Sequence, residues 1–255
     1  MNYFLTLAVI LFVYMNFWFV LSLIKKRNDI ADVAWGMGFI LLSWISIFIS
    51  ENYSLRGILI AVLVSIWGFR LAIHIHERNK NKTEDYRYLA WRKEWGKWFY
   101  IRSYLQVYIL QGIFLYMIAI PILIINSSMQ RNFGLFDLIG ISIWILGFYF
   151  EVVGDFQLAQ FIKNSKNKGK LMQSGLWAYT RHPNYFGEVT MWWGIGVMAI
   201  FASGNLLSLL GPATITFLIL KVSGIPLLEK KMEQNPDFAE YKKRVSVFLP
   251  LPQIK

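Results

Sequence analysis

The stretch YFLTLAVILFVYMNFWFVLSLIKKR (residues 3–27) decides the fold class of this chain. Residues 3–24 are almost entirely apolar, and the basic residues Lys25, Lys26 and Arg27 follow at once. A helix needs about 20 apolar residues to cross the hydrocarbon core of a bilayer. A cleaved signal peptide carries its basic residues before the apolar segment, so we interpret this stretch as a retained membrane span.

The rest of the chain has the same character. Of its 255 residues, 56% are hydrophobic and 16% are charged, which excludes an ordinary soluble domain. Further apolar runs occur at 33–50, 57–76, 104–125, 135–158, 186–203 and 206–224. We therefore expect an all-α polytopic membrane bundle of about seven transmembrane helices, forming a single domain over residues 1–255. Six or eight spans are the alternatives.

The tail that follows the last apolar run is expected to lie on the cytoplasmic face. After Pro226 its apolar residues recur at spacings near three and four, as in short amphipathic helices. Asn235 precedes Pro236, which predicts a helix N-cap followed by proline at the first helical position.

The distribution of Lys and Arg predicts how the bundle is oriented. With the N-terminus outside and seven spans, the inner segments hold 24 of the 26 basic residues and leave Arg56 and Arg131 outside. Cytoplasmic loops carry such an excess, so we expect a cytoplasmic C-terminus. Anionic lipid at the inner face then explains the net charge of +11 without a nucleic-acid partner. Cysteine is absent and only three histidines occur, so no metal site is predicted.

Carboxylates near the inner ends of spans are the first candidate site residues, because ionisable groups are costly in a membrane. Glu151 and Asp155 are four residues apart and share one face of the fifth span. They are expected to meet a cofactor or the basic loop 163–181. Asp32 lies one turn into the second span, where it is either a wall of the site or part of a buried hydrogen bond.

The segment GLWAYTRHPNYFGE (residues 175–188) crowds polar groups at the edge of the sixth span. Pro183 suits the start of a helix, whose free N–H groups would form an anion site beside Arg181. Asn184 and Glu188 then fall on one face of that helix, one turn apart. An interfacial loop with aromatic anchors and an arginine–lipid contact is the alternative interpretation.

The extended segment SGLWAYTRHPNYFGE (174–188) resembles the C-terminal signature of the steroid 5-alpha-reductase-like membrane family, including its bacterial branch. The resemblance covers nearly the whole chain. It extends to DIADVAWGMGF (29–39), WGFRLAIHIHERN (67–79), EDYRY (84–88), GDFQLAQF (154–161) and PDFAEYKKRVSVFLPLP (236–252). It implies a bundle of about seven spans in a bacterial inner membrane.

The resemblance also implies a function: reduction by NADPH of a carbon–carbon double bond in a membrane lipid or lipid-like substrate. Family cofactor contacts carry over onto Asp155, Tyr179, Asn184 and Glu188, and Arg181 and His182 match the Arg-His-Pro form of sterol reductases. The full set of predicted cofactor-binding residues is Glu151, Asp155, Trp177, Tyr179, Arg181, His182, Asn184, Tyr185 and Glu188.

The proton donor does not carry over. Steroid reductases present a Glu near the second span and a Tyr near the third, and neither is evident at matching positions here. We predict Asp32, Tyr86 and Tyr88 as catalytic substitutes. The substrate is then an enone or another unsaturated lipid, and the sequence identifies no protein partner.

A second resemblance gives a rival function. Isoprenylcysteine carboxyl methyltransferases share an Arg-His-Pro-x-Tyr core and a Glu…Tyr…Pro tail, which Glu229, Tyr241 and Pro250 could supply. The cofactor would then be S-adenosylmethionine. Asn184 and the Phe-Gly-Glu that ends the motif favour the reductase. A non-enzymatic lipid-binding membrane protein is the remaining alternative.

Overall fold

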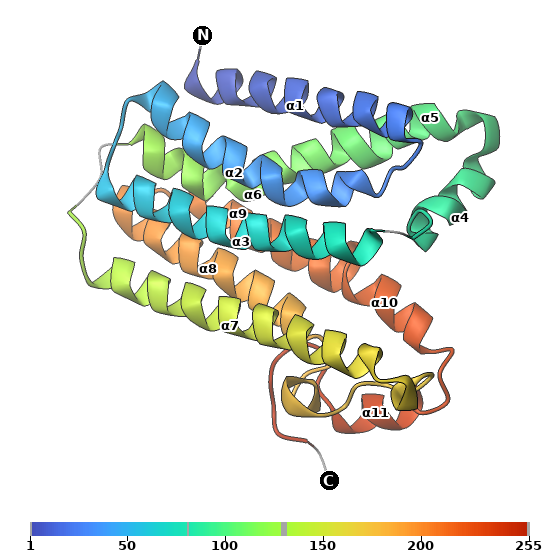
Figure 1. Ribbon diagram of the computed structural model, residues 1–255. Coiled ribbons are helices and arrows are strands. Elements are labelled where there is room, and N and C mark those ends of the chain that lie inside the picture. The colour runs from blue at the N-terminus through green and yellow to red at the C-terminus, as the bar shows by residue number, and fades with distance from the viewer. Residues whose placement is uncertain (1, 81, 129–131, 254–255) are drawn as a thin grey trace. The chain divides into compact units, whose positions relative to one another are not determined.

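The computed structural model describes residues 2–80, 82–128 and 132–253 (Figure 1). These residues form helices and no strand, and one isolated parallel bridge joins Thr180 to Ser246. Seven helical segments are long and apolar enough to cross a membrane, which confirms the all-α class and the expected number of spans. Arg131 and Lys255, both part of the charge count above, lie outside the described residues. The orientation of the termini and the identity of the membrane stay predictions.

Contacts between Cα atoms divide the chain into two compact units. Unit 1 comprises Met1–Phe133 and Ala202–Leu210, and unit 2 comprises Gly134–Phe201 and Gly211–Lys255. The single domain expected from the sequence stays a prediction.

The described residues of unit 1 form six α-helices and three short helical segments of other types. Its helices are α1 (Tyr3–Lys25), α2 (Ile30–Ser50), α3 (Leu55–Asn79), α4 (Tyr86–Trp95), α5 (Phe99–Arg102) and α6 (Leu110–Ser127). The 3-10 turn η1 (Gly96–Trp98) and the π-helix η2 (Ser103–Ile109) join α4, α5 and α6 into one helical run, and η5 (Leu206–Leu209) completes the unit. The basic, aromatic residues of 86–102 are therefore helical throughout.

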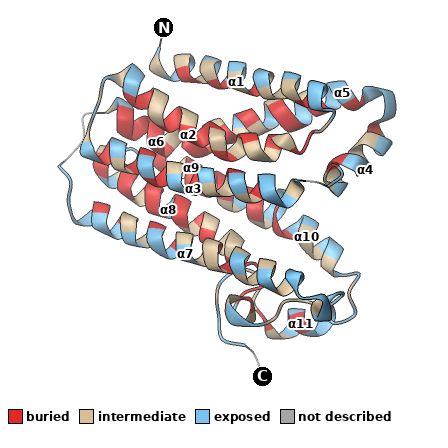
Figure 2. Ribbon diagram, viewed as in Figure 1, coloured by how far each residue is buried: buried red, intermediate tan, exposed pale blue. Residues whose placement is uncertain are grey.

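Helix α2 lies at the centre of unit 1, where it contacts α1, α3 and α6. The α2–α3 contact is close because a Cβ atom added to Gly36 would lie 2.8 Å from the carbonyl oxygen of Gly68. Small residues allow such approaches between membrane helices. Helix α1 keeps an exposed apolar face, on which Phe12 and Phe17 are 54% and 61% exposed (Figure 2). A face of this composition suits contact with lipid.

Unit 2 carries the remaining helices. They are α7 (Leu135–Lys163), η3 (Ser165–Asn167), η4 (Gly175–Ala178), α8 (Pro183–Ser203), α9 (Leu210–Phe217), the π-helix η6 (Leu218–Val222), α10 (Ile225–Met232) and α11 (Phe238–Arg244). Helix α8 begins at Pro183, as the sequence predicts. The short tail helices are confirmed in α10 and α11.

Helices α7 and α8 lie side by side in opposite directions, held close by glycines seven residues apart (Figure 1). A Cβ atom on Gly140 would lie 2.7 Å from the carbonyl oxygen of Gly194, and one on Gly147 would lie 2.6 Å from that of Gly187. Because real Cβ atoms do not approach so closely, only glycine permits this spacing. The glycine ladder fixes the register in which residues of α7 meet residues of α8.

The expected N-cap at Asn235 is wrong. Helix α11 begins at Phe238, with Asp237 at its N-cap position. The Asn235 side chain is used in two other bonds: its Oδ1 accepts from the Asp237 N–H at 2.9 Å, and its Nδ2 donates to the Gly169 carbonyl at 2.7 Å. These bonds hold residues 235–237 in a turn and delay the helix by two positions.

Candidate functional site

The predicted cofactor residues Asp155 and Asn184 meet where α7 contacts the first turn of α8. Gly154 allows this approach, since a Cβ atom there would lie 3.1 Å from the Pro183 ring. The Asn184 Nδ2 donates to Asp155 Oδ1 at 3.1 Å. Two residues that are 29 positions apart in the sequence thus form one polar centre beside the helix N-terminus.

Arg181 is buried and bound within the protein. Its Nε donates to Glu229 Oε1 at 2.7 Å, its Nη2 lies 2.7 Å from the same oxygen, and its side chain is 5% exposed. Its Nη1 donates to the carbonyl oxygens of Lys242 and Val245. These contacts differ from the expected anion site, because the guanidinium is neutralised by a carboxylate and ties the tail to α8. A direct contact between Arg181 and a cofactor stays a prediction.

His182 shares the same carboxylate. The ring is fully buried, its Nε2 lies 3.2 Å from Glu229 Oε1, and it stacks on Tyr185 with the ring centroids 5.7 Å apart. The Nδ1 atom is also buried and has no hydrogen-bond partner among the described residues. The contact with a carboxylate favours a proton on Nε2, which leaves Nδ1 as a buried acceptor.

All three contacts to Glu229 fall on Oε1, so its Oε2 is a second acceptor with no hydrogen bond to a described residue. Glu229 is itself 14% exposed. The centre therefore offers two acceptors, a carboxylate oxygen and an imidazole nitrogen, from residues already held in place by Arg181.

The C-terminal tail closes over the segment that contains these residues. Tyr241 is buried, and its hydroxyl donates to the Trp177 carbonyl at 2.6 Å. Burial raises the pKa of Tyr241, so the hydroxyl remains a donor at any physiological pH. The Thr180 hydroxyl donates to the Phe248 carbonyl at 2.9 Å, and the Arg181 N–H donates to the Ser246 carbonyl at the same distance.

The aromatic members of the predicted site differ in exposure. Trp177 is buried, and its indole N–H donates to the Gly154 carbonyl at 3.1 Å, which makes it a structural contact between η4 and α7. Tyr179 is 51% exposed and is open to a ligand. Glu151 is buried on α7 at the glycine ladder, where its backbone N lies 2.5 Å from a Cβ atom built on Gly187. Glu188 lies one turn after Asn184, on the same helix.

Unit 1 contains a second polar centre, around the predicted catalytic residues. Asp32 accepts from Arg87 Nη2 at 2.6 Å and from the Tyr88 hydroxyl at 2.8 Å. Tyr88 is buried, whereas Tyr86 is 48% exposed and is not among the donors to Asp32. The structure thus brings together two of the three predicted catalytic residues. Because the Tyr88 hydroxyl donates to Asp32, it is the proton-bearing group of the pair.

A second layer of ion pairs holds this centre in position. Asp29 binds Arg27 and accepts from the Asp85 N–H at 3.1 Å, while Glu84 binds Arg92 and accepts from the Asn28 N–H. Asp85 caps α4. Burial alone raises the pKa of Asp85, but hydrogen bonds from the Arg87 side chain and backbone outweigh it and lower the pKa.

Tyr108 is a candidate that sequence reasoning missed. It is fully buried in the π-helix η2, and its hydroxyl has no hydrogen-bond partner among the described residues. The neighbouring Ser22 hydroxyl donates elsewhere, to the Phe19 carbonyl at 2.7 Å. No signal in the sequence distinguishes Tyr108 from the other tyrosines, since its isolation depends on the packing of α1 against η2.

Comparison with known proteins gives a family and one distant relative. Residues 18–245 match the family described as "Protein of unknown function (DUF1295)". An uncharacterised protein of Schizosaccharomyces pombe, C594.04c, is 25% identical over 276 residues, which cover 98% of this chain and 80% of the relative. No solved structure matches the chain significantly. Because the match spans most of its length, the chain, with its seven helices long and apolar enough to cross a membrane, belongs to the DUF1295 family.

Proposed function

We propose that the protein is an NADPH-dependent membrane oxidoreductase that reduces a carbon–carbon double bond in an enone or another unsaturated lipid. The observation that carries the proposal is the contact between Asp155 and Asn184 at the first turn of α8. The resemblance assigns both residues to cofactor binding. The number of membrane spans alone does not bring these two side chains into contact, so their contact is an independent observation. The identity of the cofactor rests on the resemblance.

The residues present fit a dinucleotide. Its ribose hydroxyls and amino groups are donors, and the buried His182 Nδ1, the Glu229 Oε2 and the Asp155 carboxylate are acceptors. Exposed Tyr179 can stack on a ring. On this proposal Asp155, Tyr179, Asn184 and Glu188 hold the cofactor, which supplies a hydride when bound.

The chain itself supplies orientation, exclusion of water and a proton. In unit 2 the tail residues hold segment 177–182, which leads into the first turn of α8 and Asn184. In unit 1 the Tyr88 hydroxyl donates to Asp32, and a substrate oxygen that replaced Asp32 as acceptor would be polarised by the same O–H bond. Arg87 Nη2 lies 2.6 Å from Asp32 Oδ2 and holds the Asp32 side chain in place as the acceptor of the Tyr88 hydroxyl.

A second candidate function is methyl transfer from S-adenosylmethionine. The observation that favours it is that Glu229 and Tyr241, the tail residues of the second resemblance, both contact segment 177–182. Glu229 Oε2 would then face a cationic ligand. The Asp155–Asn184 contact has no place in that resemblance, which is why the reductase is preferred.

Titration of the detergent-purified protein with each cofactor tests these proposals. A ligand that binds the folded protein alone stabilises it, by about 2.7 kcal/mol at a concentration one hundred times its Kd. We expect NADPH to raise the melting temperature and S-adenosylmethionine to leave it unchanged. Stabilisation by S-adenosylmethionine alone would refute the reductase, and stabilisation by neither would favour a lipid-binding protein without catalytic activity.

Two variants locate the site. Asn184→Ala and Asp155→Ala are expected to weaken NADPH binding about tenfold each, the effect of losing one good hydrogen bond to a ligand. Gln160→Ala is the matched control, because Gln160 is an exposed polar residue of the same helix. If both site variants bind NADPH as tightly as the control does, the assignment of the site is wrong.

A further inference from the structure

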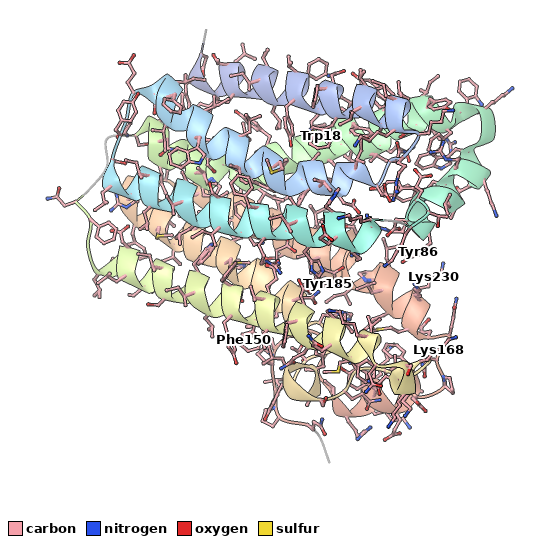
Figure 3. The ribbon with its side chains drawn as sticks, in the orientation of Figure 1. Trp18, Tyr86, Phe150, Lys168, Tyr185 and Lys230 are labelled. Carbon is pink, nitrogen blue, oxygen red and sulfur yellow. The ribbon has the colours of Figure 1, made fainter. Side chains whose placement is uncertain are left out.

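Three buried polar atoms of unit 1 have no hydrogen-bond partner among the described residues. They are the Trp18 indole nitrogen, the Tyr108 hydroxyl oxygen and the Gln111 Oε1 (Trp18 is labelled in Figure 3). Tyr108 is fully buried. A polar group that is buried without a partner costs free energy, so each such group needs an explanation. The proposed function assigns no role to these three atoms.

The three groups come from surfaces of α1 and of the η2–α6 run that face each other. The ring centroids of Phe19 and Tyr108 lie 5.3 Å apart, and Met15 Cγ lies 3.0 Å from a Cβ atom built on Gly112. As α1 advances, its contacts move back along the run, so the two helices lie in opposite directions. The short stretches that contain these contacts also carry all three unpartnered groups.

A contact with α2 shows which side of the two helices these groups occupy. A Cβ atom built on Gly38 would lie 2.5 Å from Leu115 Cδ1 and 3.2 Å from Tyr14 Cε1. Trp18 lies one helical turn after Tyr14 in α1. Gln111 lies one turn before Leu115 in α6, and because α6 runs the other way, both are displaced from the Gly38 contact in the same direction. Trp18 and Gln111 thus lie at one level of the junction of α1, α2 and α6.

The hydroxyl groups nearest to these atoms are used in other bonds. The Tyr14 ring lies beside the indole, with the ring centroids 6.2 Å apart, and its hydroxyl donates to the Ala34 carbonyl at 2.8 Å. The Ser22 hydroxyl, beside Tyr108, donates to the Phe19 carbonyl at 2.7 Å. Neither hydroxyl forms a hydrogen bond with the unpartnered atom next to it. The junction therefore leaves its own polar groups unsatisfied.

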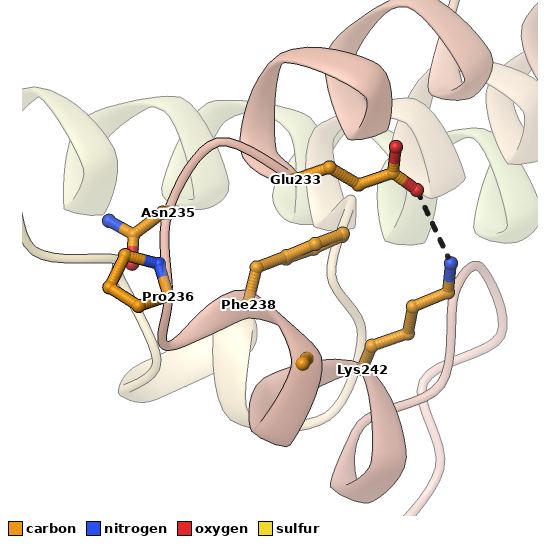
Figure 4. Close-up of a pocket in the computed structure, with 6 residues that line it drawn as sticks. Glu233, Asn235, Pro236, Phe238 and Lys242 are labelled. Atoms are coloured by element: carbon orange, nitrogen blue, oxygen red, sulfur yellow. Dashed lines mark ion pairs between the residues drawn. The ribbon is translucent and has the colours of Figure 1, made fainter.

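Polar groups at the surface of the molecule do not need such a partner. In the hollow before α11, Lys242 lies 3.8 Å from Glu233, and their side chains are 50% and 59% exposed (Figure 4). Water hydrates these two charges. The three atoms of unit 1 are instead closed to solvent and belong to helices that are long and apolar enough to span a membrane, so bulk water does not satisfy them.

We infer that the junction of α1, α2 and the η2–α6 run binds the hydroxyl group of an otherwise apolar molecule, a lipid alcohol. Tyr108 precedes Gln111 by three residues and shares its side of the run. A hydroxyl group donates one hydrogen bond and accepts two, so it can donate to Gln111 Oε1 and accept from the Trp18 N–H and the Tyr108 hydroxyl. An ether, ester or ketone oxygen would leave Gln111 Oε1 unsatisfied, because it has no hydrogen to donate.

The ligand reaches this junction from the lipid side, by displacing α1. Only 22% of the apolar part of α1 is buried, compared with 56% of the apolar part of the span Tyr86–Ser127. The facing segment η2 is a π-helix, a distortion that is frequent at functional sites. The inference goes beyond the proposed function and does not depend on NADPH, because all the residues that carry it lie in unit 1.

Binding of 1-dodecanol and of dodecyl methyl ether to the detergent-purified protein, without NADPH, tests the inference. The two probes share an apolar chain and an oxygen acceptor, but only the alcohol can donate a hydrogen bond. Radiolabelled probes at one fixed detergent concentration keep the partition into micelles the same for every variant. We expect the unsubstituted protein to bind the alcohol about tenfold more tightly than the ether, the effect of one hydrogen bond to a ligand.

Substitutions at the junction separate its acceptor from its donors. Gln111→Leu should bind the two probes equally, whereas Gln106→Leu, which replaces an exposed glutamine of η2, is the matched control and should keep the tenfold preference. Trp18→Phe and Tyr108→Phe should weaken the binding of both probes about equally, because either oxygen can accept from these donors. Each of these three junction variants removes an unpartnered group, so we expect them to fold, which thermal unfolding without probe checks.

Two results would overturn the inference and leave the NADPH experiments unaffected. One is equal binding of the two probes by the unsubstituted protein, which would mean that the junction accepts water or any apolar chain. The other is a preference for the alcohol in Gln111→Leu as large as that in Gln106→Leu. If Gln111→Leu does not fold, Trp18→Phe and Tyr108→Phe decide the question, since unchanged affinities for both probes in these variants would equally refute the site.

Discussion

Substitution of Glu229 by Gln tests whether the buried ion pair holds the C-terminal tail against α8. Removal of one partner from a fully buried pair costs about 3–5 kcal/mol, because the other charge is left unpaired. The cost is lower here, since Arg181 keeps its bonds to the Lys242 and Val245 carbonyls and the Glu229 side chain is 14% exposed. We therefore expect Glu229→Gln to lower the free energy of unfolding by about 2–3 kcal/mol.

Equilibrium denaturation in detergent micelles measures this change, with Glu233→Gln as the matched control. Glu233 is four residues further along, and its pair with Lys242 is 3.8 Å long and mostly exposed. Exposed pairs contribute about 0.2–1 kcal/mol, so the control should change stability little. Arg181→Gln, alone and with Glu229→Gln, completes a double-mutant cycle whose coupling energy reports the pair itself. If Glu229→Gln destabilises the protein no more than Glu233→Gln, the pair does not anchor the tail.

Four further predictions address packing, the unit 1 centre, pH and topology. Gly147→Ala should destabilise the protein by about 1–3 kcal/mol, because the added methyl group overpacks α7 against the α8 backbone. Gly154→Ala should cost less, because its methyl group would meet a ring carbon of Pro183 at 3.1 Å. Thermal unfolding of both variants ranks the two losses of stability. Tyr88→Phe should lower the free energy of unfolding by about 1.5–3 kcal/mol, because it removes the hydrogen bond to the Asp32 carboxylate. Tyr108→Phe should be neutral or stabilising, because the Tyr108 hydroxyl has no hydrogen-bond partner among the described residues. Equal losses of stability in denaturation would contradict this difference. The pKa of Asp85 is lowered in the folded state, so its stabilising contribution is complete above the unfolded pKa of about 3.9. That contribution is lost as the pH falls through the folded pKa. Asp85→Asn should therefore reduce the acid sensitivity of unfolding below about pH 4, which denaturation at a series of pH values measures. A reporter fused to the C-terminus should be active on the cytoplasmic side, and activity on the opposite side would overturn the orientation.

The sequence predicts the spans well because hydropathy alone decides which helices can enter a bilayer. It predicts their ends less well. Helix α7 continues to Lys163, five residues beyond the expected end, because Ala159, Gln160 and Lys163 have high helix propensity and nothing in residues 159–163 breaks a helix. The start of α8 at Pro183 was predictable, since the ring of proline fixes a backbone angle that suits the first helical position.

The pairing of α7 with α8 could have been predicted from the spacing of glycines, which a hydropathy analysis does not consider. Gly140 and Gly147 in one span, and Gly187 and Gly194 in another, each lie seven residues apart. Small residues at that spacing predict a close helix pair, and they do form the contact between α7 and α8. This contact is what brings Asp155 to Asn184, so the glycines could have predicted part of the candidate site.

The partner of Arg181 could not be predicted in the same way. Glu229 lies 48 positions later, on a helix whose place depends on how the tail folds back. A reading of the sequence from its local pattern therefore left Arg181 free to bind an anion, whereas in the structure the guanidinium is neutralised within the protein.

The role of Arg181 as an anchor bears on why two enzyme families share the Arg-His-Pro core. If the core serves to bind a tail carboxylate, as Arg181 and His182 bind Glu229, then it stabilises the same local structure whichever cofactor lies beside it. The core is then weak as a guide to reaction type. If the protein binds NADPH as proposed, discrimination against S-adenosylmethionine comes from residues outside the core, chiefly Asp155 and Asn184, and those are the positions at which the binding experiments above are aimed.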